Sequence, residues 1–151
     1  MTKSIQITQP LRAWMDVFMH RSMRGWNQFA KSTGLSMPQF SILMQLHYKG
    51  ACGMSAISER FDVSAAAASQ LVDKLVQAGY IERTEDPSDR RARLLKLSAN
   101  GAKLVEVGIQ ERYRWMDELT SRLSPAQQTK ISEALTLLTE AARQMEQRES
   151  V

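Results

Sequence analysis

The spacing of apolar residues along this 151-residue chain changes twice, from helical to alternating and back to helical. Apolar residues recur every three or four positions up to residue 78 and again after residue 98, whereas they alternate within residues 80–84 and 93–97. The first spacing is typical of amphipathic helices and the second is typical of strands. The sequence therefore predicts a mainly α fold with one small β-hairpin.

The first expected helix ends near Gly34 and has a wide, aromatic apolar face. This face holds Leu11, Trp14, Met15, Phe18, Met19, Met23, Trp26 and Phe29. A capping-box pattern follows in Ser36-Met37-Pro38-Gln39, where Ser36 caps the helix and Gln39 reaches back to it. A second helix is expected from this box to Lys49-Gly50.

The next part of the chain predicts two helices that are joined by only a few residues. The first covers residues 55–61 and the second covers residues 65–78, so together they form a helix-turn-helix candidate. The apolar residues of the second helix are expected to face the core. Its outward face is small and polar and consists of Ala66, Ser69, Gln70, Asp73, Lys74 and Gln77.

The charged loop at residues 85–92 carries the turn formers of a hairpin, and residues 80–84 and 93–97 are the expected strands. Ser98 can then cap a long helix, whose apolar face is expected to hold Val105, Ile109, Tyr113, Met116, Leu119 and Leu123. A second capping box, Ser124-Pro125-Ala126-Gln127, begins the last helix. The apolar residues of that helix are spaced four and three apart, like the seam of a helix-helix coil: Ile131, Leu135, Leu138, Ala142 and Met145.

Composition excludes several kinds of site. The single cysteine, Cys52, cannot form an internal disulfide, and with only His20 and His47 it cannot complete a four-ligand zinc site. We interpret Cys52 as a packing residue. No glycine-rich phosphate loop or nucleophile motif is recognisable, so we expect no enzyme, cofactor or metal. The apolar runs are too short to span a bilayer and no signal core is found, so a soluble cytoplasmic protein is expected.

The stretch from Val63 to Arg83, followed by Asp86-Pro87-Ser88-Asp89-Arg90-Arg91-Ala92 and Leu97-Ser98-Ala99-Asn100-Gly101, resembles the MarR family of bacterial transcriptional regulators. This resemblance implies a winged helix-turn-helix at residues 36–98, flanked by an N-terminal dimerisation arm at residues 1–35 and C-terminal dimerisation helices at residues 99–151, as one compact unit. It also implies a homodimer on a pseudo-palindromic double-stranded DNA operator, with a recognition helix in the major groove and a wing at the minor groove.

Under this resemblance, the DNA-binding residues are Ser64, Ala66, Ser69, Gln70 and Lys74 around the recognition helix, and Asp89, Arg90, Arg91 and Arg93 in the wing. Glutamine can pair with adenine, and small alanines can approach thymine methyl groups. Arginine suits a narrow minor groove, and Asp89 could orient Arg91. The run of alanines at residues 65–68 departs from the polar residues frequent in the family, so DNA shape is expected to carry more of the specificity.

A ligand-responsive repressor is the leading interpretation, and its pocket for a small aromatic or anionic ligand is expected to be lined by Trp14, Met15, Phe18, Met44, His47 and Tyr113. The net charge of +4 favours a polyanionic partner only weakly. Three alternatives stay open: the apolar faces meet within a monomer, the charged hairpin is merely solvated, or the chain is an all-helical interaction adaptor that binds no DNA.

Overall fold

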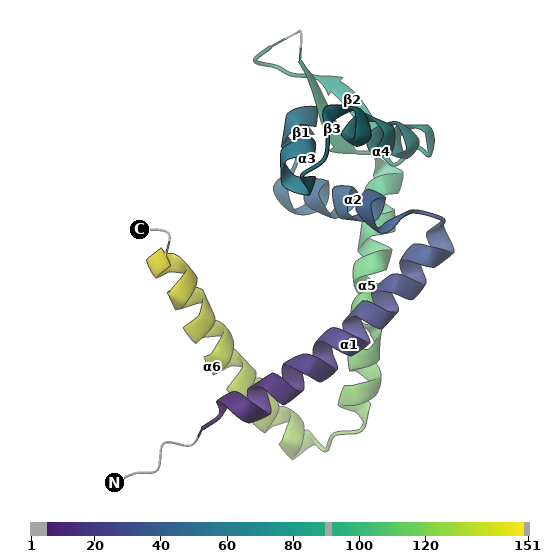
Figure 1. Ribbon diagram of the computed structural model, residues 1–151. Coiled ribbons are helices and arrows are strands. Elements are labelled where there is room, and N and C mark those ends of the chain that lie inside the picture. Colours follow the sequence, from purple (N-terminus) through teal and green to yellow (C-terminus); the bar gives the residue numbers. More distant parts are fainter. Residues whose placement is uncertain (1–5, 90–91, 150–151) are drawn as a thin grey trace. The chain divides into compact units, whose positions relative to one another are not determined.

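The computed structural model describes residues 6–89 and 92–149, and the chain divides into two compact units, with the boundary along the chain between Tyr113 and Arg114. The elements of the first unit are shown in purple to green in Figure 1, and α5 runs on into the second unit. In chain order, the elements are α1 (Thr8–Thr33), α2 (Met37–Lys49), β1 (Cys52–Gly53), α3 (Met54–Phe61), α4 (Ala65–Gln77), β2 (Ile81–Glu85), β3 (Arg93–Leu97), α5 (Ala99–Ser121) and α6 (Pro125–Glu149). The expected fold class, mainly α with a small sheet, is confirmed.

Local sequence signals fix the connection between α1 and α2. Gly34 ends α1 in the left-handed conformation (φ 73°), where its backbone N–H donates to the carbonyl of Lys31. The Ser36 backbone N–H donates to Oε1 of Gln39 at 2.9 Å, and the Gln39 N–H donates to Oγ of Ser36 at 3.4 Å. The capping box predicted from the sequence is thus confirmed, and it sets where α2 begins.

The predicted helix-turn-helix is formed by α3 and α4. Asp62 ends α3 in the left-handed region (φ 49°), and the N–H of Val63 donates to the carbonyl of Ser58 at 3.1 Å. The hydroxyl of Ser64 then accepts a hydrogen bond from the N–H of Ala67 at 3.1 Å and caps α4. This tight turn fixes the angle at which α4 leaves α3.

The sheet has three antiparallel strands in the order β1-β3-β2. The hairpin was predicted, although β2 begins at Ile81, one residue later than expected. The two-residue strand β1 was not predicted: it pairs Cys52 with Leu95 of β3. Register in the hairpin places Glu82 opposite Lys96 and Glu85 opposite Arg93.

The core of the first unit lies beneath the sheet, where α2, α3, α4 and α5 contribute fully buried apolar side chains such as Leu43, Ile57, Leu75 and Val105. A smaller aromatic cluster joins α1 to α2: the rings of Trp26 and Phe40 meet edge to face with centroids 4.4 Å apart. The face of α5 that is buried consists of Gly101, Val105 and Gly108, whereas Tyr113 of the expected face is 38% exposed.

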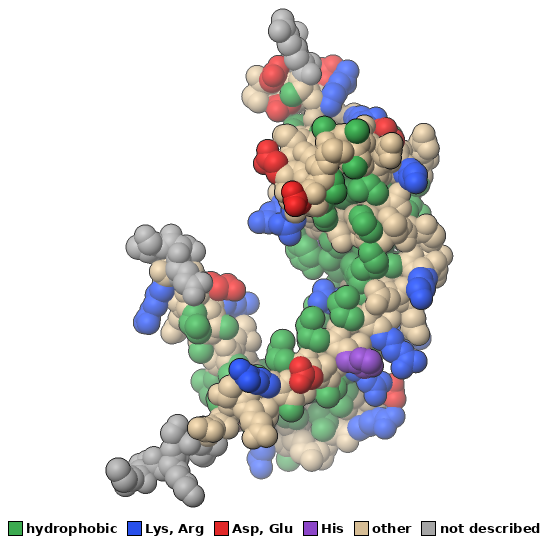
Figure 2. Space-filling model, in the orientation of Figure 1, with side chains coloured by type: hydrophobic (Ala, Val, Ile, Leu, Met, Phe, Trp, Pro, Cys, Tyr) green, Lys and Arg blue, Asp and Glu red, His purple; other side chains and the backbone are tan. Residues whose placement is uncertain are grey.

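In the second unit, the predicted capping box at the start of α6 is confirmed. The Ser124 N–H donates to Oε1 of Gln127 at 2.9 Å, and the Gln127 N–H donates to Oγ of Ser124 at 3.3 Å. The predicted seam of α6 is accessible in the single chain, with Ile131 43%, Leu135 45% and Met145 64% exposed. Figure 2 shows hydrophobic side chains at the surface of α1 and of α6. Within the described residues, no helix combines the length and apolarity needed to cross a membrane.

Candidate functional site

The outward face of α4 is polar and open to solvent. Ala66, Gln70 and Lys74 are exposed, and Ser64 is exposed at the N-cap. Ser69 is half-buried, and its hydroxyl donates to a neighbouring carboxylate. The buried side of the helix, which includes Ala68, Val72 and Leu75, packs into the core. The core therefore fixes the position of α4, while its outward face is available to a partner.

The hairpin loop is built by a network around Asp86. Its carboxylate accepts hydrogen bonds from the N–H and the hydroxyl of Ser88, at 2.8 and 2.6 Å, and these bonds hold the pKa of Asp86 below its usual value. The backbone N–H of Ala92 donates to the carbonyl of Asp89 at 2.9 Å. Arg90 and Arg91, which the sequence assigns to the wing, lie outside the described residues.

Two of the wing's cations have acidic partners across the hairpin. Nη1 of Arg93 lies 3.8 Å from Oε1 of Glu85, and Nζ of Lys96 lies 3.3 Å from Oε2 of Glu82. The register of the strands places these two acids directly opposite the two cations. Both pairs are solvated and weak, so a stronger anion can compete for either cation.

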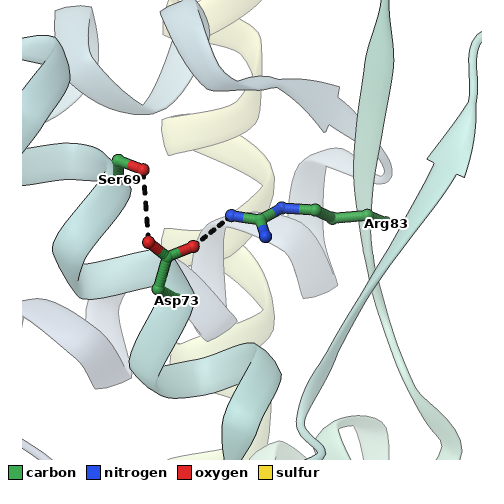
Figure 3. Close-up of polar contacts among 3 residues, drawn as sticks. All are labelled: Ser69, Asp73 and Arg83. Atoms are coloured by element: carbon green, nitrogen blue, oxygen red, sulfur yellow. Dashed lines mark hydrogen bonds and ion pairs between the residues drawn. The ribbon is translucent and has the colours of Figure 1, made fainter.

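An ion pair connects the sheet to the outward face of α4. The guanidinium of Arg83, on β2, binds Oδ1 of Asp73, and the hydroxyl of Ser69 donates to Oδ2 of the same carboxylate at 3.4 Å (Figure 3). Sequence reasoning placed Asp73 on the outward face but missed Arg83. A period of two puts Arg83 on the same side of β2 as the buried Ile81, which was the available signal.

A groove of about 360 Å³ opens in the first unit between α1, α2, α3 and α5. Its lining includes Met23, Trp26, Met44, Gln45, Arg60 and Arg112. Among the described residues, Oε1 of the buried Gln45 and Nε of Arg112 have no hydrogen-bond partner. The guanidinium of Arg112 lies 5.9 Å from the centre of the Trp26 ring. The groove thus has an aromatic wall, and two of the residues that line it carry a buried polar atom without a partner.

Of the residues predicted to line a ligand pocket, Met44 borders this groove. The rings of Phe18 and Tyr113 contact each other with centroids 6.4 Å apart. The exposed His47 meets the Tyr48 ring edge to face, while Trp14 is half-buried and Met15 is exposed. The roles of these residues stay predictions.

The other candidate groups are unremarkable chemically. Burial raises the pKa of the Cys52 thiol, which keeps it protonated and poorly nucleophilic, in agreement with its interpretation as a packing residue. Within the part of the chain that the structure describes, no cluster of three or more histidine, cysteine or acidic side chains could hold a metal ion.

A family model matches this chain, and so do two curated relatives, both of which are transcriptional regulators. Residues 35–92 match the sequence model of the MarR family. The HTH-type transcriptional regulator YfiV of Bacillus subtilis is 28% identical over 107 residues, which are 71% of this chain and 67% of the relative. YdgJ of the same organism is 25% identical over 64% of this chain and 59% of its own length. The aligned segments thus span about two thirds or less of these relatives.

Solved structures resemble the chain over nearly its whole length. The transcriptional regulator Tm0710 from Thermotoga maritima shares 26% identity with a TM-score of 0.82, covering 90% of this chain and 96% of that one. A variant of MarR from E. coli, solved in complex with operator DNA, shares the fold at 22% identity and a TM-score of 0.55, covering 89% and 99% of the two chains. The winged helix-turn-helix between long helices thus matches the MarR family in its sequence over residues 35–92 and shares the fold of these solved regulators.

Proposed function

We propose that the chain is a sequence-specific, double-stranded DNA-binding transcriptional regulator, a non-enzymatic repressor that acts in the cytoplasm as a homodimer and responds to a small ligand. The observation that carries this proposal is the exposed polar face of α4, set beside a charged hairpin on a buried helix-turn-helix core. A helix presented in this way fits the major groove, and a hairpin with arginines fits the neighbouring minor groove.

The dimer follows from the apolar surface that one chain leaves uncovered. Leu11, Met15 and Met19 on α1, and Ile131 and Leu135 on α6, are each more than a third exposed. A second copy would cover these faces through a symmetric interface made by residues 1–35 and 99–151. Two copies of α4 would then meet successive major grooves of a pseudo-palindromic operator, with half-sites about 10 base pairs apart.

The groove beside Trp26 supports the ligand response. Its volume of about 360 Å³ suits a single aromatic ring with a polar substituent. The guanidinium of Arg112, a residue that lines the groove, would donate to a carboxylate or phenolate of the ligand. A bound ligand weakens DNA binding only if it prefers a dimer geometry whose two recognition helices are wrongly spaced.

The DNA-binding proposal predicts different salt responses for wing and helix variants. Arg91→Ala should weaken binding to a duplex selected from a random-sequence pool by about 1–3 kcal/mol and reduce the logarithmic salt slope by roughly one unit. Gln70→Ala should leave the slope unchanged and relax preference at one base pair, because a neutral amide releases no counterion. Fluorescence anisotropy across a salt series measures both. Equal salt slopes and equal affinities for the wild type and Arg91→Ala would show that the wing does not contact DNA.

The ligand proposal predicts a site-specific loss of binding. In a panel of phenolic and benzoate-like compounds, at least one should raise the melting temperature of the wild type and lower its affinity for the selected duplex. Arg112→Gln should weaken that compound roughly tenfold or more, since a charge-assisted hydrogen bond is lost. The matched control is Arg24→Gln, an exposed arginine of α1 outside the groove. A panel without effect, or an equal loss in both variants, contradicts the site.

A further inference from the structure

The carboxylate of Asp73 stands on the outward half of α4, the helix that the proposed function places against DNA. A bare carboxylate there would repel the phosphates of a duplex, whose charge is one per about 1.7 Å of helix axis. The structure pairs it with Arg83, and the Arg83 and Asp73 side chains are 38% and 45% exposed. Because the pair is only partly exposed, its charges are screened less than fully solvated charges and still act on a ligand that approaches α4.

We propose that Arg83 is a positioning residue for recognition of DNA: it neutralises Asp73 and holds the carboxylate so that Ser69 is left as a hydrogen-bond acceptor toward the bases. The inference rests on the proposed function and adds a specificity device to it. Figure 3 shows Asp73 between the other two side chains, with one carboxylate oxygen toward Arg83 of β2 and the other toward Ser69, one turn earlier on α4.

The hydroxyl of Ser69 determines which groups of a base it can bind. A hydroxyl has one hydrogen to donate and two lone pairs that can accept. The hydrogen of Ser69 points to Oδ2 of Asp73, so its lone pairs are what remain for a partner. In the major groove the donors are the amino groups of cytosine N4 and adenine N6, whereas guanine offers only acceptors. Ser69 should therefore favour a cytosine or adenine amino group and disfavour the acceptors of guanine and thymine.

A double-mutant cycle separates this role from a direct phosphate contact. Arg83→Ala should weaken binding to the selected duplex roughly tenfold in the wild-type background, because one carboxylate is left uncompensated. In the Asp73→Ala background the same change should cost less than about twofold, and the double variant should bind within about threefold of the wild type. Arg83→Lys, which keeps the charge, should retain most of the affinity, and Arg12→Ala controls for net charge at an exposed site on α1.

The base preference is read from a second measurement on the same proteins. Duplexes selected by the wild type should show an adenine or cytosine preference at one position per half-site that both Ser69→Ala and Asp73→Ala relax. The two changes together should relax that position no further than either alone, since they remove one device.

Each outcome decides the inference. A tenfold loss for Arg83→Ala that persists in the Asp73→Ala background would assign Arg83 to a phosphate and overturn its role through Asp73. Identical base preferences in the wild type and Asp73→Ala would overturn the role of Ser69. A wild type that binds no duplex at any salt concentration overturns the proposed function itself, and with it the inference, whereas the first two results leave DNA binding intact.

Discussion

Replacing Gly101 by alanine should destabilise the fold by about 2–4 kcal/mol, although helix propensity alone would favour alanine by about 1 kcal/mol. Gly101 lies in the first turn of α5, directly against the backbone of Tyr80. A Cβ at Gly101 would overlap the carbonyl oxygen of Tyr80 and lie 2.9 Å from its carbonyl carbon. A backbone carbonyl cannot swing aside as a side chain can. Moreover, this same carbonyl accepts the N–H of Ser98 at 3.0 Å, so moving it disturbs the start of α5.

Gly108→Ala is the matched variant, because the added Cβ would meet side chains and not backbone. A Cβ there would lie 2.8 Å from Cε1 of Phe29 and 2.8 Å from Cζ of Phe40. Aromatic rings can shift by a few tenths of an ångström, so the cost should be smaller, about 1–3 kcal/mol. Ala102→Gly, at the neighbouring position of α5, measures the difference in helix propensity between glycine and alanine.

Urea unfolding gives the free energy of unfolding of each of the three variants. All are measured at one fixed protein concentration, because the stability of a dimer depends on concentration. The expected order of stability places Gly101→Ala lowest. If Gly101→Ala is as stable as the wild type, the close approach of α5 to Tyr80 is wrong.

The contacts of these glycines could not be predicted from the sequence, whereas the capping boxes could. The capping boxes at Ser36 and Ser124 were predictable because every atom they need lies within four residues. The buried contacts of Gly101 and Gly108 depend on residues 21 to 79 positions away in the chain, and a helical apolar pattern gives no weight to glycine. The face of α5 was therefore assigned to its larger side chains.

The same distinction applies to the sheet and the site. The alternation of residues 93–97 was sufficient to predict β3, but β1 has two residues and exists because Leu95 and Leu94 offer partners to Cys52 and Gly53. The outward face of α4 was predictable from a period of 3.6. Its link to Arg83 was not, because an ion pair between α4 and β2 depends on how the strand lies against the helix. Cross-strand pairs such as Glu85 with Arg93 likewise required the register.

A charge placed in the seam of α6 should have the largest effect on function. Leu135→Asp is expected to raise the dissociation constant of the dimer by about a hundredfold or more, since an aspartate buried in an apolar interface has no partner. Because a monomer reaches only one half-site, affinity for a pseudo-palindromic operator should fall by a similar factor. Sedimentation equilibrium and duplex binding measure the two effects independently. The first unit should keep its fold, because no residue of α6 belongs to the cores described for it.

Leu137 provides a matched control on the same helix. Like Leu135 it is an exposed leucine, at 68% against 45%, but its side chain is turned about 200° from Leu135 and about 100° from Leu138, so it lies outside the seam. Leu137→Asp should therefore leave both the dimer and duplex binding unchanged. If both variants dissociate, the dimer stands but its seam covers more of α6 than the spacing of four and three indicates. If neither variant changes the mass, or if the wild type is already monomeric at micromolar concentration, the apolar face of α6 serves another purpose and the two recognition helices cannot be spaced by it.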